Sequence, residues 1–169
     1  IEVWDYEDLK EMCNMDAVKA FRDNALNPEK PAMRGSHQNG DIFFQHREAC
    51  NTVYDQLPAI VEKYMKKVNE KLGTNYDLFN YYGAPDADRV IVAMGSVCDT
   101  IEEVVDYLNA AGEKVGLIKV RLYRPWAAKS FLKVLPETAK KIAVLDRTKE
   151  PGSFGEPLYL DVAATLREA

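Results

Sequence analysis

Residues 89–94, which read RVIVAM, decide the fold of this chain. The run is almost continuously apolar, and a turn-forming stretch, GAPD at residues 83–86, precedes it. A strand that is buried on both faces of a parallel sheet has this composition. We therefore expect residues 89–94 to form a strand inside a parallel sheet.

Helical and strand patterns alternate on both sides of this strand. Strands are expected at 77–82, 114–122 and 141–145, and helices at 99–111, 129–135 and 157–166. Such alternation requires parallel strands joined by right-handed crossovers. The sequence therefore predicts the α/β class, as a three-layer α/β/α arrangement around a mainly parallel sheet.

The first part of the chain, residues 1–73, has the pattern of helices joined by irregular connections. A loose apolar stripe predicts a helix at residues 8–24, and a longer pattern predicts helix over 45–72. Pro58 interrupts the longer pattern, so we expect a kink or two helices there. Gly73 is the expected C-terminal cap. The predicted division is a helical segment at 1–73 and an α/β domain at 74–169.

Composition limits the classes of partner and compartment. The chain has 169 residues, 47% of them hydrophobic, which suits one compact domain with or without a flanking piece. A net charge of -5 argues against nucleic acid as a partner, and no run of about eighteen apolar residues suggests a membrane span. Cys13, Cys50 and Cys98 are odd in number and far apart, which indicates packing cysteines in a reducing compartment. The first residues lack Met and a signal-peptide layout, so we expect the chain to begin within a longer protein or after processing.

Candidate binding residues lie where strands end, because ligands of open α/β sheets gather there. After the RVIVAM strand, Gly95 permits a tight turn, and Ser96 or Thr100 would contact a phosphate. The pattern is neither a P-loop nor GxGxxG, and Asp99 would repel an anion. Helix capping, with Asp99 opening a capping box, is the preferred interpretation. Arg147, in the charged loop 146–157, suits an anion site, a domain contact or ion pairing within the loop.

Other polar residues indicate no chemistry of their own. The loop 121–126, with Tyr123 and Trp126, is typical of a packed interface. His37 and His46 have no metal-ligand spacing, so polar or interface roles are preferred. The sequence predicts no catalytic residue and no metal site.

Four long strings carry a resemblance to a known family. They are MRGSHQNGDIFFQHREACN at 33–51, FNYYGAPDADRVIVAMGSVCDTIEE at 79–103, GEKVGLIKVRLYRPW at 112–126 and AVLDRTKEPGSFGEPLYLDV at 143–162. Through them the chain resembles the pyruvate:ferredoxin (flavodoxin) oxidoreductases along nearly its whole length. The family usually has Thr-Ala where Ser36 and His37 stand, and Pro where Gly40 stands, which suggests a particular subgroup.

The resemblance implies a reaction and a set of cofactors for an intact enzyme. Such enzymes oxidatively decarboxylate pyruvate with coenzyme A to acetyl-CoA and CO2, and reduce ferredoxin or flavodoxin. They use thiamine diphosphate, Mg and iron–sulfur clusters in a much longer chain, often as a homodimer. By this resemblance residues 1–73 are the tail of a pyrimidine-binding domain. Residues 74–169 are most of a second domain, similar to the C-terminal domain of transketolases and incomplete.

The family's pyruvate-contacting segment, GDG-type thiamine motif and CxxC cluster ligands do not occur in this chain. No catalytic residue is therefore carried over, no cofactor is expected to bind firmly here, and a structural or interface role is preferred. That role predicts exposed apolar patches around Phe43 and Phe44 and around residues 123–126. The alternative is an autonomous nucleotide- or CoA-binding module that uses Gly95, Ser96, Thr100 and Arg147. The expected location is the cytoplasm, or else a hydrogenosome-like organelle.

Overall fold

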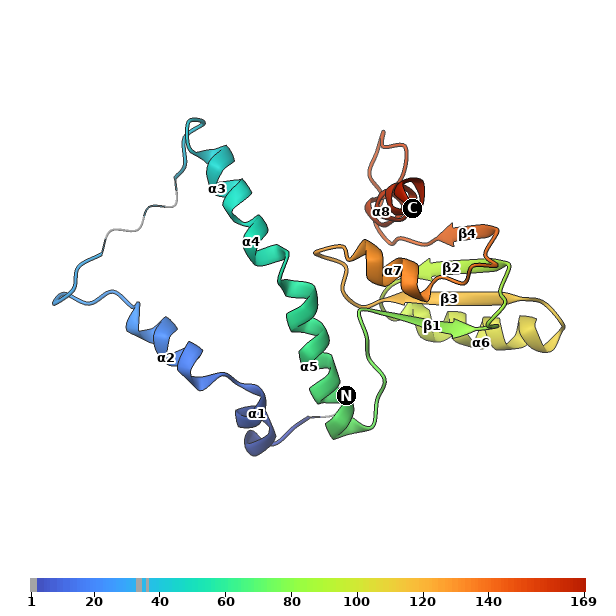
Figure 1. Cartoon of the computed structure of the whole chain (residues 1–169), viewed down its shortest axis with the longest axis horizontal. Coiled ribbons are helices and arrows are strands. Elements are labelled where there is room, and N and C mark those ends of the chain that lie inside the picture. Colours follow the sequence, from blue (N-terminus) through green and yellow to red (C-terminus); the bar gives the residue numbers. More distant parts are fainter. Residues whose placement is uncertain (1–2, 33–34, 36) are drawn as a thin grey trace. The chain divides into compact units, whose positions relative to one another are not determined.

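A computed structural model of the chain describes residues 3–32, 35 and 37–169 (Figure 1). Met33, Arg34 and Ser36, which belong to the first of the four strings, lie outside the described residues. The chain separates into two compact units, Ile1–Val53 and Tyr54–Ala169. Each unit is considered by itself below.

The first unit contains the short helices α1 (Tyr6–Met12), α2 (Met15–Asp23) and α3 (Phe43–Ala49). The single helix predicted at residues 8–24 is wrong, because Asn14 starts a new helix there. Its side-chain oxygen accepts a hydrogen bond from the Ala17 N–H at 3.1 Å, as an N-cap does. No residue of these three helices is buried.

The second unit opens with α5 (Leu57–Leu72), which follows the one-turn helix α4 (Asn51–Tyr54). Pro58 lies in the first turn of α5, where its missing N–H costs nothing, so the predicted division at Pro58 is confirmed. Gly73 ends α5 in the left-handed conformation at φ 66°, and its N–H donates to the Asn69 carbonyl at 2.9 Å. The predicted cap is therefore confirmed.

The sheet has four strands in the order β1-β3-β2-β4. They are β1 (Phe79–Gly83), β2 (Arg89–Ala93), β3 (Val115–Val120) and β4 (Lys141–Val144). The RVIVAM run forms β2, parallel to both of its neighbours, with Val92 opposite Ile118 and Val144. The edge strand β1 runs antiparallel to β3. The predicted α/β class with a mainly parallel sheet is confirmed.

Helices cover both faces of this sheet (Figure 1). On one face α6 (Val97–Ala110) buries Cys98, Ile101 and Val105 against a group that includes Leu117. On the other face α7 (Ala128–Val134) and α8 (Pro157–Glu168) bury Phe131, Leu158 and Val162. These two helices pack on Val90 and Val92 of β2. Val90 and Val92 alternate along the strand with the residues that face α6. This alternation explains why β2 is apolar on both faces.

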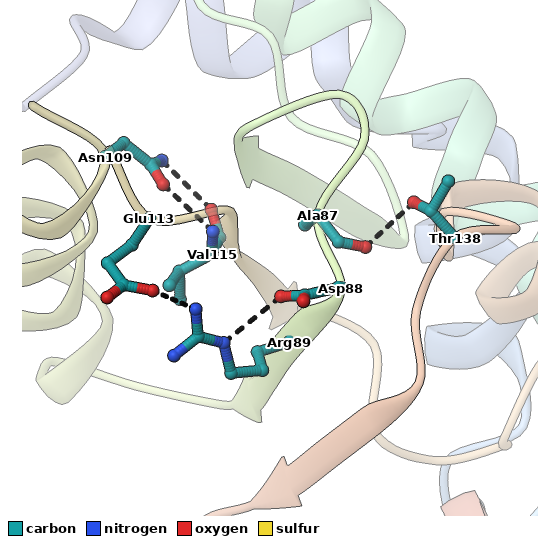
Figure 2. A network of polar contacts seen from close by, with 7 residues as sticks. All are labelled: Ala87, Asp88, Arg89, Asn109, Glu113, Val115 and Thr138. Atoms are coloured by element: carbon teal, nitrogen blue, oxygen red, sulfur yellow. Dashed lines mark hydrogen bonds and ion pairs between the residues drawn. The ribbon is translucent and has the colours of Figure 1, made fainter.

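The amino ends of β2 and β3 are fastened by side chains (Figure 2). The Asn109 amide donates to the Val115 carbonyl at 3.0 Å and accepts from the Val115 N–H at 2.9 Å. The Thr138 hydroxyl donates to the Ala87 carbonyl at 2.8 Å. Arg89 forms ion pairs with Asp88, at 3.1 Å, and with Glu113. This edge of the sheet is therefore a structural clasp, and the carboxyl edge is left for other roles.

Candidate functional site

A cleft lies at the carboxyl edge of the sheet, where two loops diverge. The loop after β2 leads to α6 on one face, and the loop after β4 leads to α8 on the opposite face. Because β2 and β4 are neighbours in the sheet, this divergence leaves a crevice of the kind in which open α/β sheets bind ligands. The cleft has a volume of about 800 Å³. It is lined by Met94, Gly95, Ser96, Val97, Thr100, Leu145, Asp146 and Arg147.

The structure brings together all four residues that the sequence predicts for an anion site. Gly95, Ser96 and Thr100 come from the β2–α6 turn, and Arg147 comes from the loop after β4. Gly95 has φ +79°, a left-handed conformation that favours glycine, and its carbonyl accepts the Cys98 N–H at 3.1 Å. All four residues are exposed to solvent.

The preferred capping interpretation for this turn is wrong. The helix begins at Val97, two residues before Asp99, and Ser96 occupies the cap position without a side-chain cap hydrogen bond. Asp99 instead lies in the first turn, where its charge favours the positive end of the helix dipole. The N-terminus of α6 therefore receives no capping side chain from Ser96 or Asp99.

Acidic side chains organise the loop on the β4 side of the cleft. Asp146 accepts hydrogen bonds from the Thr148 N–H and from the Leu158 N–H in the first turn of α8, both at 3.2 Å. The Glu156 carboxylate accepts from Lys149 Nζ at 2.8 Å and from the Glu150 N–H at 2.6 Å. The Lys149 hydrogen bond is the main cause that lowers the pKa of Glu156. An ion pair within this loop is thus present for Lys149, but its partner is Glu156, whereas the sequence suggested pairing among Asp146, Arg147, Lys149 and Glu150.

Arg147 differs from Lys149 because no ion pair holds it among the residues that the structure describes. The cleft therefore offers one guanidinium, two hydroxyls and the start of α6 to an anionic group. Asp146 lines the same cleft, and its negative charge repels an anion on that side. The sequence suggested Asp146 only as a partner for ion pairing within the loop, whereas its carboxylate accepts backbone N–H groups, including that of Leu158 at the start of α8.

The described part of the chain contains no cluster of side chains that would support metal or thiol chemistry. No group of three His, Cys, Asp or Glu side chains is arranged to hold a metal ion among these residues. His37 Nε2 is hydrogen-bonded to the Asn39 side-chain oxygen, 2.7 Å away. Cys98 is buried, and this burial raises the pKa of its thiol. The predicted packing role fits Cys98, but it is wrong for Cys13, which is exposed.

The two predicted apolar patches have different outcomes. Phe43 and Phe44 are 53% and 68% exposed, as predicted. The prediction of an exposed patch around residues 123–126 is wrong, because Trp126 is partly buried and packs against the core of the second unit. Its ring meets Phe79 edge-on at 5.1 Å, and its N–H donates to the Thr165 hydroxyl at 2.8 Å.

Two family models match the chain in succession. Residues 1–66 match the model described as pyruvate flavodoxin/ferredoxin oxidoreductase, thiamine diP-binding. Residues 87–169 match the model described as pyruvate:ferredoxin oxidoreductase core domain II. Of the elements within this first match, the helices α1, α2 and α3 bury no residue.

Named relatives cover almost the whole chain. The pyruvate-flavodoxin oxidoreductase of Enterobacter agglomerans is 62% identical over 98% of the chain. The pyruvate:ferredoxin oxidoreductase of Moorella thermoacetica is 60% identical over 99% of it. The chain spans 14% of the length of each of these relatives.

A solved structure, the 2-oxoglutarate:ferredoxin oxidoreductase from Magnetococcus marinus with 2-oxoglutarate, coenzyme A and succinyl-CoA bound, is 23% identical. It aligns with 54% of this chain and 16% of its own chain at a TM-score of 0.38. Among the described residues no helix is both long and apolar enough to cross a membrane. The two successive family matches and the identity to named relatives establish that this chain belongs to the pyruvate:ferredoxin (flavodoxin) oxidoreductase family.

Proposed function

We propose that the intact protein is an enzyme that oxidatively decarboxylates pyruvate with coenzyme A, gives acetyl-CoA and CO2, and reduces ferredoxin or flavodoxin. The observation that carries this proposal is the identity of 62% and 60% to relatives with these names, spread over nearly the whole chain. Thiamine diphosphate, Mg, iron–sulfur clusters and coenzyme A serve the intact enzyme in this proposal. The enzyme is a cytoplasmic homodimer, with a hydrogenosome-like organelle as the alternative location.

Within that enzyme we propose a structural and interface role for residues 1–169. The support is the first unit, whose helices α1 to α3 bury no residue while Phe43 and Phe44 face solvent. Apolar surface of this kind requires a covering partner. The remaining domains of the same enzyme are the proposed partners, with residues 1–73 ending the first domain and 74–169 forming most of the second.

The direct test is pyruvate- and CoA-dependent reduction of ferredoxin or flavodoxin by the intact protein. One acetyl-CoA and one CO2 are expected for each two electrons delivered, since oxidation of pyruvate to this level releases two electrons. Reduction that depends on another 2-oxoacid, with pyruvate inactive, would refute the proposed substrate.

A second candidate function, an anion- or CoA-binding cleft, is favoured by one observation. Gly95, Ser96, Thr100 and Arg147, from two separate loops, line the same cleft of about 800 Å³. Calorimetric titration with coenzyme A, compared with thiamine diphosphate, tests this candidate. Saturable binding that Arg147→Ala weakens and Lys149→Ala leaves unchanged would support the cleft, because Lys149 belongs to the same loop but pairs with Glu156. Equal effects of both substitutions, or no binding, would exclude it.

A further inference from the structure

A second hollow in the second unit is lined mainly by residues of α5. This α5 groove has a volume of about 420 Å³; α5 contributes Ile60, Tyr64 and Val68, and Tyr76 and Arg121 come from segments outside α5. Val61 and Met65 form its base and pack against the core of the second unit. Through these two residues α5 packs on the core of the second unit.

Two pairs of a cation and a tyrosine lie at the α5 groove. Tyr64, Tyr76 and Arg121 line the groove, and Lys67 lies beside it, over the Tyr64 ring. Lys67 Nζ lies 5.2 Å from the centre of the Tyr64 ring, and the Arg121 guanidinium lies 4.5 Å from that of Tyr76. Arg121 Nε also donates to the Asn80 side-chain oxygen at 2.6 Å, which fixes the guanidinium. Cation–π contacts of this type hold a charge at a defined place without neutralising it.

These two positive charges lack a negative partner. Within the described part of the chain, neither Lys67 nor Arg121 forms an ion pair with a carboxylate. The α5 groove is largely apolar, and Ile60, which lines it, is 46% exposed. Its complement is an apolar surface that carries negative charge where it meets Arg121, with Lys67 beside the groove adding to the positive field.

We infer that the α5 groove binds an apolar segment that bears aspartate or glutamate. This segment belongs to the same polypeptide outside residues 1–169. This inference rests on the proposed function, in that it requires a larger enzyme around the chain. The relatives supply the scale, because the chain spans 14% of their length and most of such a polypeptide lies elsewhere. A segment of the same polypeptide has a high effective concentration, so a groove of this modest size suffices to hold it.

The test maps the neighbour of Ile60 in the intact enzyme. A photo-crosslinking amino acid replaces Ile60, and the linked peptides are identified by mass spectrometry. The expected peptide comes from the same polypeptide outside residues 1–169, and it is apolar with at least one acidic residue. The control places the same crosslinker at Tyr107, an exposed position on α6, and is expected not to yield that peptide.

A charge reversal separates recognition from mere proximity. Arg121→Glu is expected to lower the yield of the Ile60 crosslink by about fivefold or more, and Arg121→Lys to retain most of it. Crosslinks to a different polypeptide, to residues 3–53, or to no peptide would overturn the inference, as would an Arg121→Glu yield equal to that of the unaltered enzyme. Pyruvate-dependent reduction of ferredoxin is measured on the same samples. Full activity without the expected crosslink refutes this inference alone, and the crosslink without pyruvate activity refutes the proposed substrate alone.

Discussion

Replacement of Asn109 by alanine tests whether the clasp at the amino edge of the sheet stabilises the second unit. The substitution removes both hydrogen bonds between the Asn109 amide and the Val115 backbone. The Val115 carbonyl keeps a partner, because it also accepts the Ala84 N–H at 3.1 Å. The Val115 N–H loses its side-chain acceptor in a buried residue, which costs roughly 1–3 kcal/mol, and the second bond adds about 1 kcal/mol.

One opposing effect lowers this sum. Alanine is the better helix former at the end of α6 by roughly 0.5 kcal/mol. The net loss of unfolding free energy is therefore about 2 kcal/mol, which at a urea dependence of about 2 kcal/mol/M lowers the unfolding midpoint by about 1 M. Urea unfolding followed by circular dichroism measures this midpoint.

The matched control for this experiment is Asn109→Asp. Its carboxylate still accepts from the Val115 N–H and loses only the donor half of the exchange. Its loss is expected to be smaller than that of alanine, even though a negative charge near a helix C-terminus is unfavourable by up to about 1 kcal/mol. A midpoint for Asn109→Ala equal to that of the unaltered chain would show that the clasp does not contribute.

Three further outcomes are expected from the packing, the backbone and the charges. Phe131→Ala is expected to lower the unfolding free energy by roughly 3–5 kcal/mol, since the Phe131 side chain is fully buried. In the same urea assay Phe154→Ala is expected to lower it by less than about 0.5 kcal/mol, because Phe154 is 92% exposed. Gly95→Ala is expected to cost about 1 kcal/mol through its left-handed backbone alone, since nothing lies within 4 Å of the added Cβ; a much larger loss of thermal stability would contradict this. The pKa of Glu156 is lowered chiefly by Lys149, so the stability from this pair is fully present above the ordinary value of 4.5 and is lost as the pH falls through the lowered value. Acid titrations of thermal stability should therefore fall more steeply for the unaltered chain than for Glu156→Gln, and identical curves would contradict the assignment.

The sequence predicts the centre of this fold better than its periphery. The RVIVAM strand is evident because a strand covered on both faces is apolar at every position. The direction of β1 is not evident, because the apolar alternation of a short strand is the same in parallel and antiparallel pairing. The break at Asn14 is missed because a local side-chain cap overrides an apolar periodicity that continues across it.

At the candidate site, too, some features can be predicted from the sequence and others cannot. Rules for strand ends bring Gly95 and Arg147 together from separate loops, since the topology alone places the ends of β2 and β4 side by side. Trp126 is misassigned to an interface because aromatic residues in loops suit both surfaces and cores. Its actual neighbour, Phe79, lies far away in the sequence. The start of α6 is missed because Ser96 already has helical backbone angles and caps without its side chain.

The separation between the clasp and the β2–β4 cleft has a consequence for mutational tolerance. The bonds through Asn109, Thr138 and Arg89 lie at the edge opposite the loops that carry Gly95 and Arg147. Exposed loop residues at the carboxyl edge, apart from Gly95 and the carboxylates of Asp146 and Glu156 that hold the loop after β4, are therefore free to diversify with little effect on the sheet beneath them. A combinatorial library confined to these exposed positions of the two loops should retain folded members at high frequency, whereas the same library placed in the clasp should lose most of them.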